Sequence, residues 1–181
     1  MEIIQIPHPS LRKTAHPVQG VDKKLISFVA ELEKTLKNAR NPQGVGLAAP
    51  QVDKLWRLFT IRLDKPLTII NPVITKHAKK QTFHEQEDGA PSLEGCLSMP
   101  KLWGPVPRWE WVELEFEELR NNKLVKRSKK FSDIEGRVIQ HEYDHLEGIL
   151  FTDYSLEYDL PVYQEQGKRF REVDPEFLEL I

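Results

Sequence analysis

The chain has 181 residues, of which 39% are hydrophobic and 30% are charged, and its formal net charge is −2. This length suits one domain spanning residues 1–181, and the composition is typical of a folded, water-soluble protein. The charge gives no sign of a nucleic-acid surface, no apolar run approaches the roughly 20 residues that span a bilayer, and residues 1–10 lack the pattern of a secretory signal. We therefore expect a cytoplasmic protein that binds neither nucleic acid nor membrane.

The first predicted element is an amphipathic helix at residues 22–40. Asp22 is a suitable N-cap, and Asn41-Pro42 is a stop signal. The apolar residues between these signals recur at the helical period and form one stripe: Leu25, Val29, Leu32 and Leu36.

Strands are predicted next, at residues 56–63 and 67–70, with Asn71-Pro72 ending the second. Residues 75–92 are polar and acidic, which favours a long exposed hairpin or loop. Alternation of apolar residues with glutamates predicts a half-buried strand at 112–117.

Beyond this strand, Asn121-Asn122 is a turn signal, and residues 123–131 are the expected antiparallel partner. A second helix is predicted from Ser132 to Gly148. Ser132 and Glu135 have the spacing of a capping box, and Gly148 stands where a C-terminal glycine cap belongs. One side of this helix is expected to point into the protein: Ile134, Val138, His141, Glu142 and His145. Helices and short strands without βαβ alternation indicate an α+β fold, with short mixed or antiparallel sheets around this central helix.

The second helix contains the sequence QHEYDHLEG, residues 140–148, which has the H-E-x-x-H pattern. His141 and His145 lie one helical turn apart, so both imidazoles can reach one metal ion. Glu142 projects about 100° further round the helix and is better placed to accept a proton from a metal-activated water. A solvated helix with incidental histidines is the alternative, but the inward phase and the cap signals favour a metal site.

The third ligand is open on this pattern alone. A zincin-type peptidase would use a downstream glutamate, for which Glu157 or Glu165 is available. The only cysteine, Cys96, is a buried apolar residue, a reactive thiol or a metal ligand. A thiolate with two imidazoles leaves a fourth position for water.

A third unusual stretch is GVGLAAPQ, residues 44–51. Its glycines allow close backbone approach, and Gln51 could donate an amide hydrogen bond to a developing oxyanion. A plain turn from loop to strand is the simpler alternative.

Together, GVGLAAPQ, EGCLS (residues 94–98) and QHEYDHLEG resemble, in order and spacing, the three signature motifs of the peptide deformylase family. The resemblance implies hydrolysis of the N-formyl group from formyl-methionine at the start of new polypeptides, with release of formate. It also implies that Cys96 joins His141 and His145 as the third ligand of one divalent metal ion.

The resemblance implies further roles in the site. Glu142 would transfer protons, while the Gln51 side chain and the Leu97 backbone N–H would form the oxyanion hole. Substrate would be bound at positions that match the family's peptide-binding and methionine-pocket residues, together with the aromatic residue that follows the cysteine motif: Val45, Gly46, Gly95, Val138 and Trp103.

The implied metal is Fe²⁺ in many members, with Zn²⁺, Ni²⁺ or Co²⁺ as possible occupants, and the implied partners are nascent chains with possible transient ribosome contact. Trp103 departs from the pattern, because many relatives carry an arginine there. The zincin-type peptidase is the enzymatic alternative. A peptide-binding or ribosome-docking module is the non-enzymatic one, although a structural metal site usually has four protein ligands and the sequence offers three.

Overall fold

The computed structural model describes residues 1–40, 43–62, 65–84, 89–167 and 169–178. Its helices are two 3₁₀ turns and four α-helices: η1 (Pro9–Arg12), α1 (Lys23–Asn38), η2 (Ala49–Val52), α2 (Asp133–Glu147), α3 (Phe151–Tyr158) and α4 (Pro175–Leu178). Within the described ranges, no helix is both long and apolar enough to cross a membrane.

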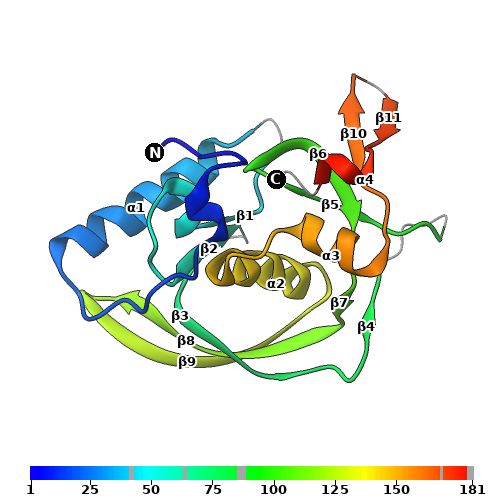
Figure 1. The fold of residues 1–181 in the computed structure, drawn as a ribbon. Coiled ribbons are helices and arrows are strands. Elements are labelled where there is room, and N and C mark those ends of the chain that lie inside the picture. Colours follow the sequence, from blue (N-terminus) through cyan, green and yellow to red (C-terminus); the bar gives the residue numbers. More distant parts are fainter. Residues whose placement is uncertain (41–42, 63–64, 85–88, 168, 179–181) are drawn as a thin grey trace.

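The strands of the described residues form three antiparallel sheets. The largest has the order β1-β2-β3-β8-β9, the second β11-β10-β6-β5, and the smallest pairs β4 with β7. Their bounds are β1 (Gly46–Ala48), β2 (Leu58–Arg62), β3 (Pro66–His77), β4 (Gln81–Thr82), β5 (Leu93–Cys96), β6 (Met99–Pro105), β7 (Arg108–Trp109), β8 (Trp111–Arg120), β9 (Lys123–Ser132), β10 (Tyr163–Gln166) and β11 (Arg169–Glu172). Figure 1 shows α2 at the centre, with β8 and β9 curving beneath it. The prediction of an α+β fold with antiparallel sheets is confirmed.

Apolar packing holds α2 against the five-stranded sheet. Ile139 and Leu146 of α2 share a buried cluster with sheet residues such as Phe59 and Leu114. Burial of side chains of this size stabilises the fold by about 1.5–3 kcal/mol each, so this cluster fixes where the polar side of α2 faces. A second cluster joins α1 to β2 and β3, and a third lies under β6 and α3.

The N-terminal amphipathic helix is α1, which covers the first strands of the large sheet. Asp22 accepts a hydrogen bond from the Leu25 backbone N–H at 2.8 Å, so it caps the helix as the sequence predicts. All four residues of the predicted stripe are buried. The helix ends at Asn38, and the predicted stop, Asn41-Pro42, lies outside the described residues.

The predicted end of a strand at Asn71-Pro72 is wrong. β3 continues through these residues to His77, with a shift in its register to β8 between Ile70 and Val73. Asn71 takes a positive φ of 50°, and its side-chain amide is bonded to the backbone of Val18 at 2.8 and 3.0 Å. An irregularity of this kind tolerates a proline without ladder N–H, so the strand bends here instead of ending.

The predicted loop at residues 75–92 is also partly wrong. Its first residues complete β3, and β4 within it pairs with β7. Short strands of polar residues carry no alternating apolar signal, which is why the sequence pattern missed them. Residues 85–88 lie outside the described part of the chain.

The predicted hairpin around Asn121-Asn122 is confirmed. β8 buries Val112, Leu114 and Phe116, and β9 is its antiparallel partner. Both asparagines have positive φ, 48° and 57°, as a two-residue hairpin turn of type I′ requires.

The second predicted helix is present as α2, but two details of its first turn are wrong. The Ser132 hydroxyl donates to the Asp133 side chain at 2.7 Å and caps no backbone N–H, while Glu135 pairs with Lys129 at 3.6 Å. Ile134 is 55% exposed, because this end of the stripe faces an open pocket and not the apolar core. Gly148 ends α2 in the left-handed conformation, with φ 73°, as predicted.

Candidate active site

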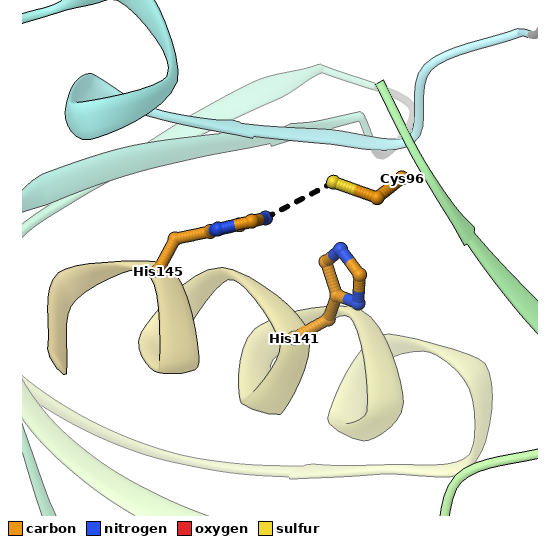
Figure 2. Close-up of side chains that lie close together, drawn as sticks. All are labelled: Cys96, His141 and His145. Carbon is orange, nitrogen blue, oxygen red and sulfur yellow. Dashed lines mark hydrogen bonds between the residues drawn. The ribbon is translucent and has the colours of Figure 1, made fainter. Parts of the chain in front are cut away.

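Three potential metal ligands from two elements meet beside α2. Cys96 lies at the end of β5, and His141 and His145 lie one turn apart on α2 (Figure 2). Their ligand atoms all lie within 4.8 Å of one another, and the Cys96 Sγ is 3.3 Å from the His145 Nε2. This is the one cluster of potential metal ligands among the described residues, and neither Glu157 nor Glu165 belongs to it.

These three side chains fit a divalent metal ion. The His141 Nδ1 lies 3.2 Å from the Glu94 carboxylate, so its other ring nitrogen is free to face an ion, as in metal sites whose outer groups orient the histidine. Burial and the charges of His141 and Arg108 lower the pKa of His145, which favours the neutral imidazole that binds metals. One thiol and two imidazoles form a donor set suited to iron, zinc, nickel or cobalt.

Glu142 lies next to the ligands on α2 and is 3% exposed. Burial raises its pKa to about 7, although the charges of His141 and Arg108 act in the opposite direction. Its Oε2 is buried with no hydrogen-bond partner among the described residues. A carboxyl group with this pKa can both accept and return a proton near neutral pH.

Gly46 on β1 provides the space for the Glu142 side chain. A Cβ at position 46 would overlap the Glu142 Oε1, so any larger residue would displace the carboxylate. The GVGLAAPQ stretch therefore contains a glycine required by a close approach, and it is more than a plain turn.

Gln51 on η2 lies next to Cys96 of the ligand group. Its Oε1 accepts a hydrogen bond from the Ala48 N–H at 2.8 Å, which fixes the orientation of the amide. Its Nε2 then points to the Cys96 Sγ at 3.4 Å and to the Ser98 hydroxyl at 3.2 Å. An amide N–H is thus held beside the metal-ligand group, where it can stabilise negative charge.

A cavity of about 410 Å³ opens beside these groups. Apart from His145, every site residue predicted from the sequence lines it, and His145 is buried behind with 1% exposure. The lining residues from this set are Val45, Gly46, Gln51, Gly95, Cys96, Leu97, Trp103, Val138, His141 and Glu142. The cavity size is within the range of small-ligand sites.

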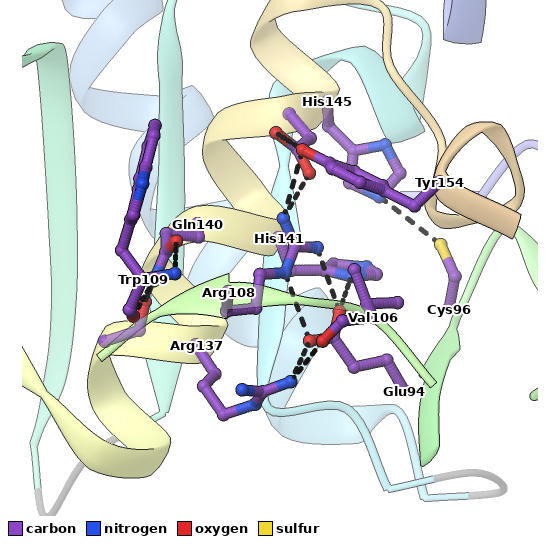
Figure 3. A network of polar contacts seen from close by, with 12 residues as sticks. Glu94, Cys96, Val106, Arg108, Trp109, Arg137, Gln140, His141, His145 and Tyr154 are labelled. Carbon is purple, nitrogen blue, oxygen red and sulfur yellow. Dashed lines mark hydrogen bonds and ion pairs between the residues drawn. The ribbon is translucent and has the colours of Figure 1, made fainter. Parts of the chain in front are cut away.

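A buried ionic network supports His141 from below (Figure 3). Arg108, 2% exposed, donates to both Glu94 oxygens at 3.1 and 2.9 Å and to Asp144 at 2.5 Å. Arg137 donates to Glu94 at 3.2 Å. Burial alone would raise the pKa of Glu94, but the charge of Arg108 and the hydrogen bonds from His141 and Arg108 hold it far below its usual value.

Sequence reasoning missed this network. Glu94 and Asp144 stand inside the recognised motifs, within two residues of the predicted metal ligands, and that closeness was the available signal. Arg108 and Tyr154, whose hydroxyl donates to Asp144 at 3.2 Å, lie in stretches without any motif. Their roles depend on tertiary contacts alone.

Comparison with known proteins places these features in a family. A sequence profile described as polypeptide deformylase matches residues 1–159. The peptide deformylase of Chlorobium phaeobacteroides is 37% identical over 151 residues, which cover 79% of this chain and 72% of that protein. The peptide deformylase of Treponema pallidum is 37% identical over 154 residues, which cover 84% and 86%.

Solved structures agree with the sequence matches. The structure of a peptide deformylase from Synechococcus elongatus in complex with actinonin has a TM-score of 0.74 and 32% identity, and covers 85% of this chain and 78% of that chain. The peptide deformylase from Thermotoga maritima has a TM-score of 0.71 and 30% identity, and covers 84% and 95%. The chain therefore belongs to the peptide deformylase family, the metallohydrolases that remove the N-formyl group from nascent polypeptides.

Proposed function

We propose that Cys96, His141 and His145 bind the catalytic metal, with Fe²⁺ as the physiological ion and Zn²⁺, Ni²⁺ or Co²⁺ as substitutes. The observation that carries this proposal is the approach of one sulfur and two imidazoles to within 4.8 Å beside a buried glutamate. When bound, such an ion supplies an activated water at neutral pH and polarises the formyl oxygen. Three protein ligands leave a position open, as catalytic sites require.

The residues around the ligands divide the remaining chemistry. Glu142 accepts the proton of the attacking water and returns it to the departing amine, for which a pKa of about 7 is suited. The Gln51 Nε2 and the Leu97 backbone N–H donate to the oxyanion that forms on the formyl group. For Gln51, this requires exchanging one of its present acceptors, Cys96 or Ser98, for the substrate oxygen.

The substrate would lie along the cavity between β1 and β5. Each is an edge strand in its sheet, so an extended peptide can pair with the backbone at Gly46 and Gly95. Val45, Val138 and the half-buried Leu97 would enclose the methionine side chain. Trp103, which lines the same cavity, would contact the residues after methionine through its apolar face, and so favour bulky apolar residues there.

The substrate is made by ribosomes, so we also propose a cytoplasmic location and a transient contact with translating ribosomes. Sedimentation of the protein with ribosomes that carry a formylated nascent chain would test this contact. Equal sedimentation without ribosomes would contradict it.

Formate release from a formyl-methionyl peptide tests the main proposal. We expect release from protein purified without oxygen and loaded with Fe²⁺, and metal analysis should find one ion per chain. Cys96→Ala should lose both metal and activity, whereas a site with a downstream glutamate as third ligand would keep the metal. Retention of metal and turnover by Cys96→Ala would therefore overturn the assigned ligand set.

A further inference from the structure

The indole of Trp103 forms part of the cavity wall and lies over Gly95. The two residues are Cα partners in the pairing of β5 with β6. A Cβ at position 95 would lie 2.7 Å from the indole Cε3 and Cζ3 atoms, so the ring occupies the space that a side chain at 95 would take. The position of this ring therefore decides the shape of the cavity next to the metal-ligating strand.

A residue of the C-terminal hairpin holds this ring. Glu165 on β10 accepts a hydrogen bond from the Trp103 Nε1 at 3.1 Å. That N–H is the only polar group of the tryptophan side chain. The strand that carries Glu165 is aligned directly on β6, because Tyr163 is the Cα partner of Trp103 and Glu165 lies two residues further on the same face.

The hairpin itself is a defined part of the sheet. β10 and β11 pair over four residues each, and the Val173 N–H donates to the Val162 carbonyl at 2.8 Å to close its base. Figure 1 shows it standing out from the molecule beyond α3. The hairpin lies after residue 159, where the match to the family profile ends, so the profile does not describe this part of the chain.

We propose that Glu165 is a positioning residue that fixes Trp103 as a wall for the substrate residues after methionine. This inference rests on the proposed contact between Trp103 and those residues. Glu165 does not touch the reacting atoms. It acts by keeping the indole flat over Gly95, so that a bulky apolar substrate side chain meets a preformed surface and does not have to order the ring on binding.

The kinetic test uses formyl-Met peptides that carry either leucine or glycine after the methionine. We expect Glu165→Ala to raise KM for the leucine peptide by about threefold to tenfold, the range for loss of one hydrogen bond, with kcat within twofold. The glycine peptide should change by less than twofold. Glu165→Gln keeps an oxygen acceptor and should restore KM for the leucine peptide, and Glu172→Ala, an exposed glutamate on the same hairpin, is the matched control.

A spectroscopic test follows the ring directly. In ¹⁵N-labelled protein, the indole N–H signal of Trp103 is the one that disappears in Trp103→Phe. We expect this signal to shift in Glu165→Ala but to stay near its wild-type position in Glu165→Gln and Glu172→Ala. In the Trp103→Phe background, Glu165→Ala should cause no further change in KM.

Four results would overturn the proposal. A KM in Glu165→Gln as high as in Glu165→Ala would mean that the charge of Glu165, and not its hydrogen bond, acts on the substrate. An unmoved indole signal in Glu165→Ala would remove the positioning contact. A raised KM in Trp103→Ala with wild-type KM in Glu165→Ala would overturn positioning alone. Unchanged KM in both of these variants would also remove the proposed substrate contact of Trp103.

Discussion

At the scale of single residues, the Glu142 side chain occupies space that is open because residue 46 is a glycine. Its carboxylate fills the position where a Cβ on Gly46 would stand, which sets it beside the ligand group and away from solvent. Burial then raises its pKa to about 7. The same close approach thus gives the carboxyl group both its location and its proton affinity.

Replacement of this carboxylate should separate chemistry from metal binding. We expect Glu142→Gln to keep its metal and to lose at least ~10²-fold in kcat, the usual scale for removal of a positioned general base. Formate release and metal content of the same preparation measure both effects. Glu135→Gln, at a half-exposed position on the first turn of the same helix, should change neither. A metal-free Glu142→Gln protein would show that Glu142 is a ligand instead.

Glu94 supports His141 from outside the ligand group. Glu94→Gln removes the charge that faces the His141 Nδ1 and both arginines, so we expect metal affinity to fall about 10- to 100-fold. Competition with a chelator of known affinity measures the change. Glu118→Gln, which breaks a surface ion pair with Arg120, should leave the affinity unchanged. Equal affinities for both variants would contradict a supporting role for Glu94.

At the scale of elements, the end of α2 is fixed by a glycine packed against the N-terminal segment. Gly148 has φ 73°, and a Cβ there would lie 2.7 Å from the Arg12 backbone carbon. The helix therefore ends in a conformation and in a space that both favour glycine. This joins α2 to η1 at one defined point, close to His145.

Two glycine variants distinguish strain from steric overlap at this point. Gly20 also has positive φ, 76°, but a Cβ there meets nothing within 4 Å. We expect Gly20→Ala to destabilise the protein by roughly 1–2 kcal/mol from backbone strain alone. Gly148→Ala should cost a further ~1–3 kcal/mol, because the backbone of Arg12 has to move. Urea unfolding of the two variants measures this difference, and equal losses would show that the overlap at Gly148 is relieved without cost.

The elements also show what the sequence could and could not predict. Helix α1, the β8–β9 hairpin and the glycine end of α2 follow from local signals: an apolar period, an Asn-Asn turn and a C-terminal glycine. No local signal predicts that β3 continues through Asn71-Pro72, because the irregularity there is stabilised by a distant partner, the backbone of Val18. The three residues of the proposed ligand set stand in the sequence motifs, and the structure brings them together. Arg108, which holds two of those motifs together, gives no local signal.

At the scale of the whole molecule, the site joins two separate sheets. Cys96 belongs to the four-stranded sheet, whereas His141 and His145 lie on the helix that packs against the five-stranded sheet. Arg108 makes a second connection, because it bonds both Glu94 on β5 and Asp144 on α2. Metal binding should therefore stabilise the contact between β5 and α2 more than it stabilises α1.

Removal of the metal should thus lower stability in a localised way. At a free metal concentration 1,000 times the dissociation constant, binding adds about 4 kcal/mol, which corresponds to a rise in Tm of roughly 8–16 °C for a chain of this size. We expect chelation to reverse that rise, and hydrogen exchange of the chelated protein to increase in β5 and in α2 around residues 141–145, with little change in α1. Cys96→Ala, which lacks the proposed ligand from the four-stranded sheet, should show almost no response of Tm to chelator. The same Tm loss in this variant as in wild type would mean that the ion does not join the two sheets through Cys96.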